Sequence, residues 1–204
     1  MSRLASALFL LLLCGAASAA PFQNGSFEIG GRQTSCNNTF NIPVGSTLIP
    51  GWTVSAGNID WEGGPPCGWQ ASRGTFSLDL VGNAAGGIGG IQQTFDTIPG
   101  VTYKVSFDLA GNYGGLPVVK PLTVTVAGDT HTYTFDTTGK SQFNMGWTRI
   151  HFTFVAPSTS TTINFVSDVS ALGGLNNAGA AIDNVVVHRK KHQPVCRSAL
   201  SLPC

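Results

Sequence analysis

Apolar and polar residues alternate with a period of two in one segment after another of this chain. In 101–109 (VTYKVSFDL) every second side chain is apolar, and Thr, Lys, Ser and Asp stand between them. A period of two places the apolar side chains on one face of a β-strand and the polar ones on the other. The same pattern occurs in 75–81, 121–126, 131–136, 147–155, 161–167 and 180–188.

Turn-forming residues separate these segments. Clusters of Gly, Pro, Asn and Asp bound each run, and the chain contains 26 Gly and 11 Pro. No segment keeps the period of an amphipathic helix over about ten residues. About ten short strands joined by turns are typical of packed antiparallel sheets, so the sequence predicts an all-β sandwich or jelly roll.

The N-terminus has the three parts of a secretory signal peptide. Arg3 supplies a positive start, 8–13 (LFLLLL) form a short apolar core, and Ala17-Ser18-Ala19 give the small residues before a cleavage site. The apolar core is shorter than the roughly 20 residues that span a bilayer, and no later segment resembles a transmembrane helix. We expect 1–19 to be removed by cleavage before Ala20.

The expected mature chain has one domain over 20–188 and a basic, cysteine-containing tail over 189–204. Export places the protein in the extracellular space or the cell wall, or in the periplasm or on the surface of a bacterium. Cysteines in exported chains commonly form disulfides. Cys36, Cys67, Cys196 and Cys204 can pair in three ways, and we favour Cys36 with Cys67 and Cys196 with Cys204.

Charge is distributed unevenly along the chain. Residues 20–187 carry six Lys/Arg against ten Asp/Glu, hence a net charge of −4, whereas 188–204 add Arg189, Lys190, Lys191 and Arg197. A nucleic-acid-binding domain usually shows a basic surface on its folded body. We therefore expect no nucleic-acid partner and regard the basic patch as a terminal feature.

Motifs for catalysis are weak. The chain has no G-x-S-x-G elbow, no H-E-x-x-H motif and no histidine at ligand spacing from Cys36 or Cys67. Asp60 and Glu62 could in principle act as the carboxylate pair of a glycoside hydrolase, because they lie two apart on a strand and share a face. Such pairs are more often solvated or hydrogen-bonded to a ligand, so we expect no enzyme.

Signals for ligand binding are stronger. The segment 58–69 (NIDWEGGPPCGW) places Trp61 between two carboxylates, and 111–115 (GNYGG) places an amide and an aromatic ring at a strand end. Aromatic faces stack on sugar rings, and carboxylates and amides bind their hydroxyls. We predict a carbohydrate site in which Trp61 and Tyr113 stack, although Trp61 could equally be part of the core. The remaining predicted members are Asp60, Glu62 and Asn112, with Asp79 and Asp108 as outward-facing polar groups on the sheet.

An ordered set of short motifs resembles the DUF642 family. These motifs are 24–28 (NGSFE), 49–54 (IPGWTV), 58–61 (NIDW), 78–82 (LDLVG), 91–94 (IQQT), 99–108 (PGVTYKVSFD), 109–112 (LAGN) and 180–185 (AAIDNV). The family includes plant cell-wall proteins and bacterial exported proteins described as choice-of-anchor C proteins. The resemblance implies a galactose-binding-domain-like jelly roll. Plant members usually carry two such domains, so this single domain is closer to the bacterial members.

The resemblance also implies partners and a metal. It implies binding to wall polysaccharides or to wall-modifying proteins rather than catalysis. It further suggests a structural Ca²⁺ held by Glu28 and Asp183, at the meeting of the first and last strands. The alternative is that both carboxylates hydrogen-bond to loop amides without a metal.

The sequence thus predicts an exported, non-catalytic protein that binds cell-wall or extracellular polysaccharide. The competing interpretation is an extracellular protein-interaction or surface-matrix component with a lectin-like fold. A glycan hydrolase is the third interpretation, and the catalytic groove that it would need is not visible in the sequence.

Overall fold

The computed structural model describes residues 20–30, 40–66, 68–82, 86–172 and 177–191. The described parts contain ten β-strands and one short 3₁₀ turn, and no α-helix. The elements are β1 (Phe40–Pro43), β2 (Thr53–Glu62), β3 (Ser77–Asp79), β4 (Ile88–Asp96), β5 (Thr102–Gly111), β6 (Val119–Val126), β7 (Asp129–Asp136), β8 (Thr148–Val155), β9 (Ser160–Asp168), η1 (Ser170–Leu172) and β10 (Ala180–Arg189).

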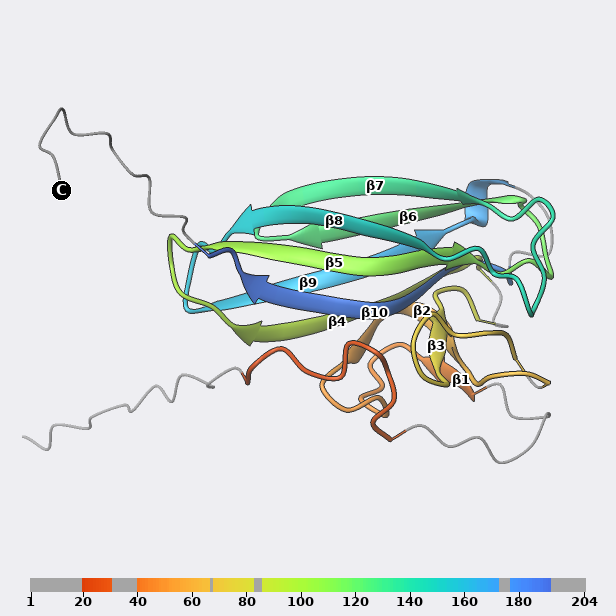
Figure 1. The fold of residues 1–204 in the computed structure, drawn as a ribbon, viewed down its shortest axis with the longest axis horizontal. Coiled ribbons are helices and arrows are strands. Elements are labelled where there is room, and N and C mark those ends of the chain that lie inside the picture. The colour runs from red at the N-terminus through yellow and green to blue at the C-terminus, as the bar shows by residue number, and fades with distance from the viewer. Residues whose placement is uncertain (1–19, 31–39, 67, 83–85, 173–176, 192–204) are drawn as a thin grey trace, which may run out of the picture.

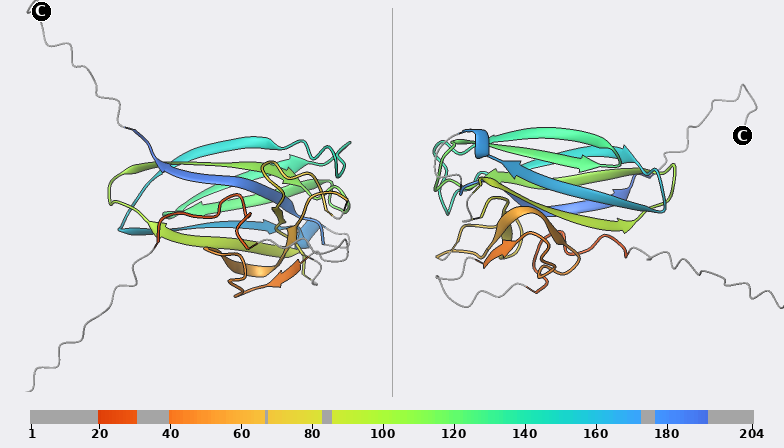
Figure 2. Two further views of the ribbon diagram at one scale, coloured as in Figure 1. Left: turned by 60° about the horizontal axis from the view of Figure 1, so that its bottom comes forward. Right: turned by 180° about the vertical axis from the view of Figure 1, so that it is seen from behind.

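The strands form two layers, which Figures 1 and 2 show from three directions. Sheet A has the order β7-β6-β9-β4 and ends on the first half of β2. Sheet B begins on the second half of β2 and continues through β3, β10, β5 and β8, with β1 also paired to β2. All of these pairings are antiparallel. The predicted all-β jelly-roll sandwich is therefore confirmed.

Strand β2 passes from one layer to the other at Gly57. Residues before Gly57 pair with β4, and residues after it pair with β1 and β3. Gly57 has φ +45°, and a Cβ built there would lie 1.9 Å from the carbonyl oxygen of Ile88. Only glycine allows a left-handed backbone in such close contact with the neighbouring strand, so this residue forms the corner of the sandwich.

The core lies between the layers and is rich in aromatic rings. Phe107 of β5 meets Phe165 of β9 edge to face with ring centroids 5.3 Å apart, and it meets Tyr133 of β7 at 5.7 Å. Tyr103, Val105, Phe107 and Leu109 are all buried, as the alternation in 101–109 predicts. The period-two pattern thus identified the inner face of β5 correctly.

The outer faces of the two sheets differ in what covers them. The segment 63–76 lies over the outer face of sheet B near β3, where Trp69 Nε1 donates a hydrogen bond to Ser77 Oγ at 2.8 Å. Ser77 and Asp79 on the outer face are fully buried, and so is Leu78, which faces the core. The Thr residues on the outer face of sheet A are half-buried or exposed.

The ends of the described chain lie at the same end of the sandwich. Ala20 bridges to Phe95 at the end of β4, and β10 ends beside the start of β5. No helix in the described parts is long and apolar enough to cross a membrane. The predicted signal peptide and the four cysteines lie outside the described residues, as does the tail from residue 192.

Candidate functional site

Two of the predicted binding carboxylates face each other across β2 and β3. Asp60 and Asp79 are register partners, and Glu62 lies two residues further along β2 opposite Ser77. The loop that contains Trp69 lies against Glu62, and other neighbours enclose the two aspartates, so Asp60, Glu62 and Asp79 are exposed by 4%, 7% and 0%. The structure therefore gathers three predicted site residues into one buried acidic cluster.

Burial is the main cause of the electrostatics of this cluster. It raises the pKa of Asp60 to about 6, and a hydrogen bond from the Asn41 amide partly opposes the rise. It raises the pKa of Glu62 to about 8, with further contributions from the charges of Asp79 and Asp60. The pKa of Asp79 rises to about 7 for the same reason, although it accepts several hydrogen bonds. At neutral pH the cluster therefore holds protons.

Asn112 connects this cluster to the loop that follows β5. Its amide nitrogen donates to Asp79 Oδ2 at 2.6 Å, and its amide oxygen accepts the backbone N–H of Gly114 at 2.8 Å. The neighbouring side chain, Tyr113, is 37% exposed. Asn112 is thus a positioning group in the fold, and Tyr113 is the member of the predicted set whose ring remains accessible.

Trp61 does not occupy the position that a stacking residue needs. Its side chain points into the core and is 3% exposed, and its Nε1 donates to the carbonyl oxygen of Phe27 at 3.2 Å. The prediction that Trp61 stacks on a sugar is therefore wrong for this structure. The alternative stated from the sequence, a core residue, is confirmed. The cause is alternation itself, because neighbours of the outward-facing Asp60 must face inward.

Asp108 belongs to a different cluster on sheet B. Ser72, Asn184 and Arg149 all donate hydrogen bonds to its carboxylate, the last at 2.9 Å. Burial alone would raise the pKa of Asp108, but these donors and the guanidinium charge hold it below its ordinary value. Asp79 and Asp108 lie on the outer face of sheet B, as predicted, but both are buried by their hydrogen-bonding neighbours and so are not open to a ligand.

The predicted calcium ligands lie on either side of the loop 72–76. Glu28 Oε1 accepts the backbone N–H groups of Thr75 and Phe76 at 2.9 and 2.8 Å, and Asp183 Oδ2 accepts that of Arg73 at 2.7 Å. Burial, and then the charges of Asp108 and Glu28, raise the pKa of Asp183 to about 7. The two carboxylates are thus near enough to repel.

The donor chemistry at this place suits a hard cation, because Ca²⁺ prefers carboxylate and carbonyl oxygens. Among the described residues, however, no group of three or more Asp, Glu, His or Cys side chains is arranged to hold a metal. A calcium shell would need backbone carbonyls of the loop in addition to Glu28 and Asp183. Both carboxylates already accept loop amides, which is the metal-free alternative.

The structure also reveals a hollow that the sequence did not indicate. It lies on the outer face of sheet A, has a volume of about 400 Å³, and is lined by Gln92, Thr125, Val126, Ala127, Gly128, Thr130, Thr162 and Asn164. Gln92 pairs with Asn164, which pairs with Thr125, which pairs with Thr130. Amides and hydroxyls from four strands therefore form one row across the sheet.

The hollow is uncharged and combines amides and hydroxyls with small apolar groups. None of its lining residues is charged or aromatic, and the only Lys or Arg in the sheet A strands is the fully buried Lys120. Two of its groups are held in place: Asn164 Oδ1 accepts from Ser55 Oγ at 2.6 Å, and the hydroxyls of Thr162 and Thr94 lie 2.7 Å apart. The alternating threonines in 121–126 indicated a polar outer face on this strand. Which residues of the adjacent strands lie beside them is set by the strand register, which the sequence does not show.

Solved structures with this arrangement of strands include carbohydrate-binding modules. TmCBM61 in complex with β-1,4-galactotriose matches with a TM-score of 0.52 at 18% identity, over 85% of this chain and 100% of that one. The CBM22-1 xylan-binding domain of Paenibacillus barcinonensis Xyn10C matches with a TM-score of 0.50 at 17% identity, over 87% and 100%. The fold is thus that of the jelly-roll carbohydrate-binding modules.

An enzyme structure also contains this fold as one part. The arabinose-bound MgGH51 α-L-arabinofuranosidase matches with a TM-score of 0.50 at 18% identity, over 84% of this chain and 26% of the enzyme. Identities this low establish the fold and leave the ligand open.

The chain belongs to the DUF642 family, described as a protein of unknown function, whose family model matches residues 20–188. The resemblance drawn from the short motifs is therefore confirmed. Halomucin of Haloquadratum walsbyi (strain DSM 16790 / HBSQ001) is 32% identical over 169 residues, which is 81% of this chain. This chain spans only 2% of the length of halomucin.

Proposed function

We propose that this protein is an exported, non-catalytic carbohydrate-binding protein that holds a neutral polysaccharide in the hollow of sheet A. The observation that carries the proposal is the row of amides and hydroxyls formed by Gln92, Asn164, Thr125 and Thr130. Amides and hydroxyls can both donate hydrogen bonds to sugar hydroxyls and accept hydrogen bonds from them. Because the hollow is open, a long polysaccharide can extend beyond it at both ends.

The absence of acids in this hollow supports binding without cleavage. Glycoside hydrolysis needs a pair of carboxyl groups beside the scissile bond. The residues that line the hollow include no Asp or Glu, and the pair considered from the sequence, Asp60 and Glu62, is buried. Incubation with β-1,4-galactan or xylan should accordingly release no reducing ends.

Affinity electrophoresis in gels that contain β-1,4-galactan, xylan or no polymer tests the binding proposal. We expect retardation by at least one neutral polymer, and we expect Gln92→Ala to weaken it about tenfold, as the loss of well-oriented hydrogen bonds would. Tyr113→Ala is the matched control at the other predicted site. Retardation that is lost in Tyr113→Ala and kept in Gln92→Ala would place the ligand at the β5 end and overturn the proposal.

The same gels separate glycan binding from protein binding. If the protein instead acts through a wall-modifying protein, no neutral polymer retards it, and free oligosaccharides fail to displace the protein partner. Either result would favour the surface-matrix interpretation over ours. Detection of the protein outside the cell, with a mature start at Ala20, would support the proposed export.

We also propose that Glu28 and Asp183 hold a structural Ca²⁺ together with loop carbonyl oxygens. A bound cation would relieve the repulsion that contributes to the raised pKa of Asp183. Millimolar Ca²⁺ should raise the melting temperature by several degrees relative to EGTA, since a ligand at 100 times its Kd adds about 2.7 kcal/mol. Glu28→Gln should abolish this difference. Equal melting temperatures in Ca²⁺ and EGTA would contradict the proposal.

A further inference from the structure

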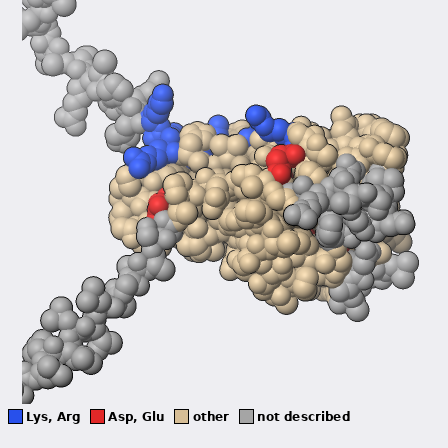
Figure 3. Space-filling view, turned by 90° about the horizontal axis from the view of Figure 1, so that it is seen from below, with Lys and Arg blue, Asp and Glu red and all other residues tan. Residues whose placement is uncertain are grey.

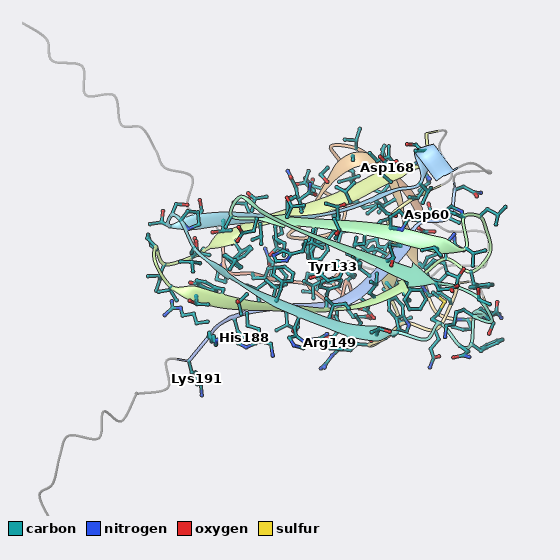
Figure 4. All side chains as sticks on the ribbon, turned by 90° about the horizontal axis from the view of Figure 1, so that it is seen from above. Asp60, Tyr133, Arg149, Asp168, His188 and Lys191 are labelled. Atoms are coloured by element: carbon teal, nitrogen blue, oxygen red, sulfur yellow. The ribbon has the colours of Figure 1, made fainter. Side chains whose placement is uncertain are left out.

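Basic side chains gather on sheet B at the end of the sandwich where the described chain ends. We call Lys104, His188, Arg189, Lys190 and Lys191 the basic strip. Register places His188 directly opposite Lys104, and the N–H of Lys190 donates to the carbonyl oxygen of Thr102 at 2.9 Å. Figure 3 shows Lys and Arg along this side, and Figure 4 places His188 and Lys191 there.

The strip is part of the folded sheet. The sequence alone suggested that the basic patch was a terminal feature separate from the domain. The backbone pairing of β10 with β5 continues as far as Lys190, so Lys104, His188 and Lys190 share one face of a regular ladder, whereas Arg189, opposite Tyr103, lies on the other face. Neighbouring strands lie about 4.8 Å apart and alternate residues about 6.7 Å apart along a strand. The ladder therefore holds the backbones of Lys104 and Lys190 at a fixed, short separation, with Arg189 and Lys191 beside them.

These basic side chains form no ion pair with an acidic residue in the described part of the chain. The one ion pair found there joins Arg149 to Asp108, about half-way along sheet B. His188, Arg189, Lys190 and Lys191 are exposed, and Lys104 is half-buried. Because 20–187 carries a net charge of −4, this concentration of positive charge is a local feature and not a property of the whole surface.

We propose that the basic strip is a second binding site, which takes an acidic polysaccharide. A single exposed ion pair contributes about 0–1 kcal/mol, so one acidic sugar would bind weakly. A polymer with a negative charge on successive units can engage several cations at once, and the contributions then combine through effective concentration. The strip lies on the opposite layer from the hollow, so one domain could hold a neutral and an acidic polymer together.

The chemistry around the strip favours a polymer over a lipid surface. Proteins that lie on membranes combine basic residues with large apolar side chains that enter the bilayer. The exposed apolar residues nearby are Val155 of β8, Val186 of β10 and Ile98 in the turn before β5, which are too few to form a membrane-inserting face. An anionic membrane is therefore the competing outcome of the test.

The test compares two double variants with the same change of charge. Lys104→Gln with Lys190→Gln removes two cations of the strip, and Arg73→Gln with Lys140→Gln removes two elsewhere. Retention of the full chain is measured on immobilised polygalacturonate in 50 to 500 mM NaCl. We expect retention that falls with salt, a loss of at least fivefold in affinity in the strip variant, and a change below twofold in the control.

Three results would overturn the proposal. They are equal losses in the two variants, no retention of the wild-type protein, and binding to phosphatidylglycerol vesicles without retention on polygalacturonate. Thermal melts should show both variants folded. Retardation by neutral polymers should be unchanged in the strip variant, because the hollow is on the other sheet. A failure of the neutral-polymer proposal and a failure of this one are thus seen in different assays.

Discussion

The outer faces of sheets A and B come from strands with the same alternating pattern, yet their environments are opposite. On sheet A the outward residues include Thr125, Thr162 and Asn164, which are neutral and at least partly exposed. On sheet B the outward residues near β3 include Asp60 and Asp79, which are buried. Burial of the sheet B carboxylates therefore costs free energy when they are ionised. The outward residues of sheet A named here carry no charge, so they have no such cost.

The comparison shows how the fold separates stability from ligand contact. Buried residues, such as Asp79, are fixed by several partners and contribute to the free energy of folding. Residues of the open face have few protein partners, so their hydrogen-bonding groups are available to a ligand. We expect substitutions in the covered part of sheet B near β3 to change stability, and substitutions in the hollow of sheet A to change binding.

The largest change in the free energy of unfolding should come from a substitution at Gly57, where β2 passes from sheet A to sheet B. Gly57→Ala places a Cβ against the carbonyl of Ile88 and forces a side chain into a left-handed backbone. We expect a loss of at least about 3 kcal/mol in the free energy of unfolding, measured by urea denaturation.

Gly64→Ala is the control for this substitution. A Cβ at Gly64 would meet only Thr75, at an ordinary distance of 3.8 Å. Its effect should stay below about 1 kcal/mol. If the two alanine variants were equally stable, the close contact at the corner of β2 would not be a determinant of the fold.

The second-largest effect should be a dependence of stability on pH, caused by the buried carboxyl groups of sheet B. The pKa of Glu62 is about 8 in the folded protein against an ordinary value of 4.5. Between these values the folded protein binds a proton that the unfolded chain releases, so stability falls as pH rises. Glu62→Gln, which stays neutral, should raise stability at pH 8.5 by about 1–3 kcal/mol and change it little at pH 4.5.

Chemical denaturation at both pH values measures this difference. Asp129→Asn, on an exposed residue of β7, is the control and should show no comparable gain at pH 8.5. A gain in Glu62→Gln of the same size at pH 4.5 and pH 8.5 would mean that packing, and not charge, causes it.

The positions of the strands could be predicted from the sequence, but the path of the loop that covers part of sheet B could not. Alternation placed Asp60 and Glu62 on one side of β2 and Trp61 on the other. The path of the loop that lies against Glu62 depends on distant contacts, such as those between Glu28 and the amides of Thr75 and Phe76, 47 and 48 residues away. A local pattern carries no information about such contacts.

The hollow was unpredictable for a related reason. Thr125 and Asn164 are polar residues at outward positions of their strands, and each alone is unremarkable. They become neighbours because β6 pairs with β9 in one register, and a shift by one residue would turn Asn164 away. Tyr113 was easier to recognise, because a strand end followed by glycines predicts an exposed loop.

A smaller effect should follow when the cover of sheet B is loosened. Trp69→Phe keeps a buried ring but removes the hydrogen bond to Ser77 Oγ. We expect a loss of about 1–2 kcal/mol, because a buried hydroxyl loses its partner. Ser77→Ala should cost a similar amount, and the double variant should cost less than the sum. Strict additivity in urea denaturation would show that the two groups do not interact in solution.

The smallest effect on stability should come from the open face, where Thr94 and Thr162 share one hydrogen bond. Both side chains are exposed, so Thr94→Val and Thr162→Val should each change the free energy of unfolding by less than about 0.5 kcal/mol. Only Thr162 lines the hollow. Thr162→Val should therefore weaken retardation by neutral polysaccharide several-fold, whereas Thr94→Val leaves the Thr162 hydroxyl free and should not. Because both variants break the same bond, unequal binding at equal stability can only reflect contact with the ligand.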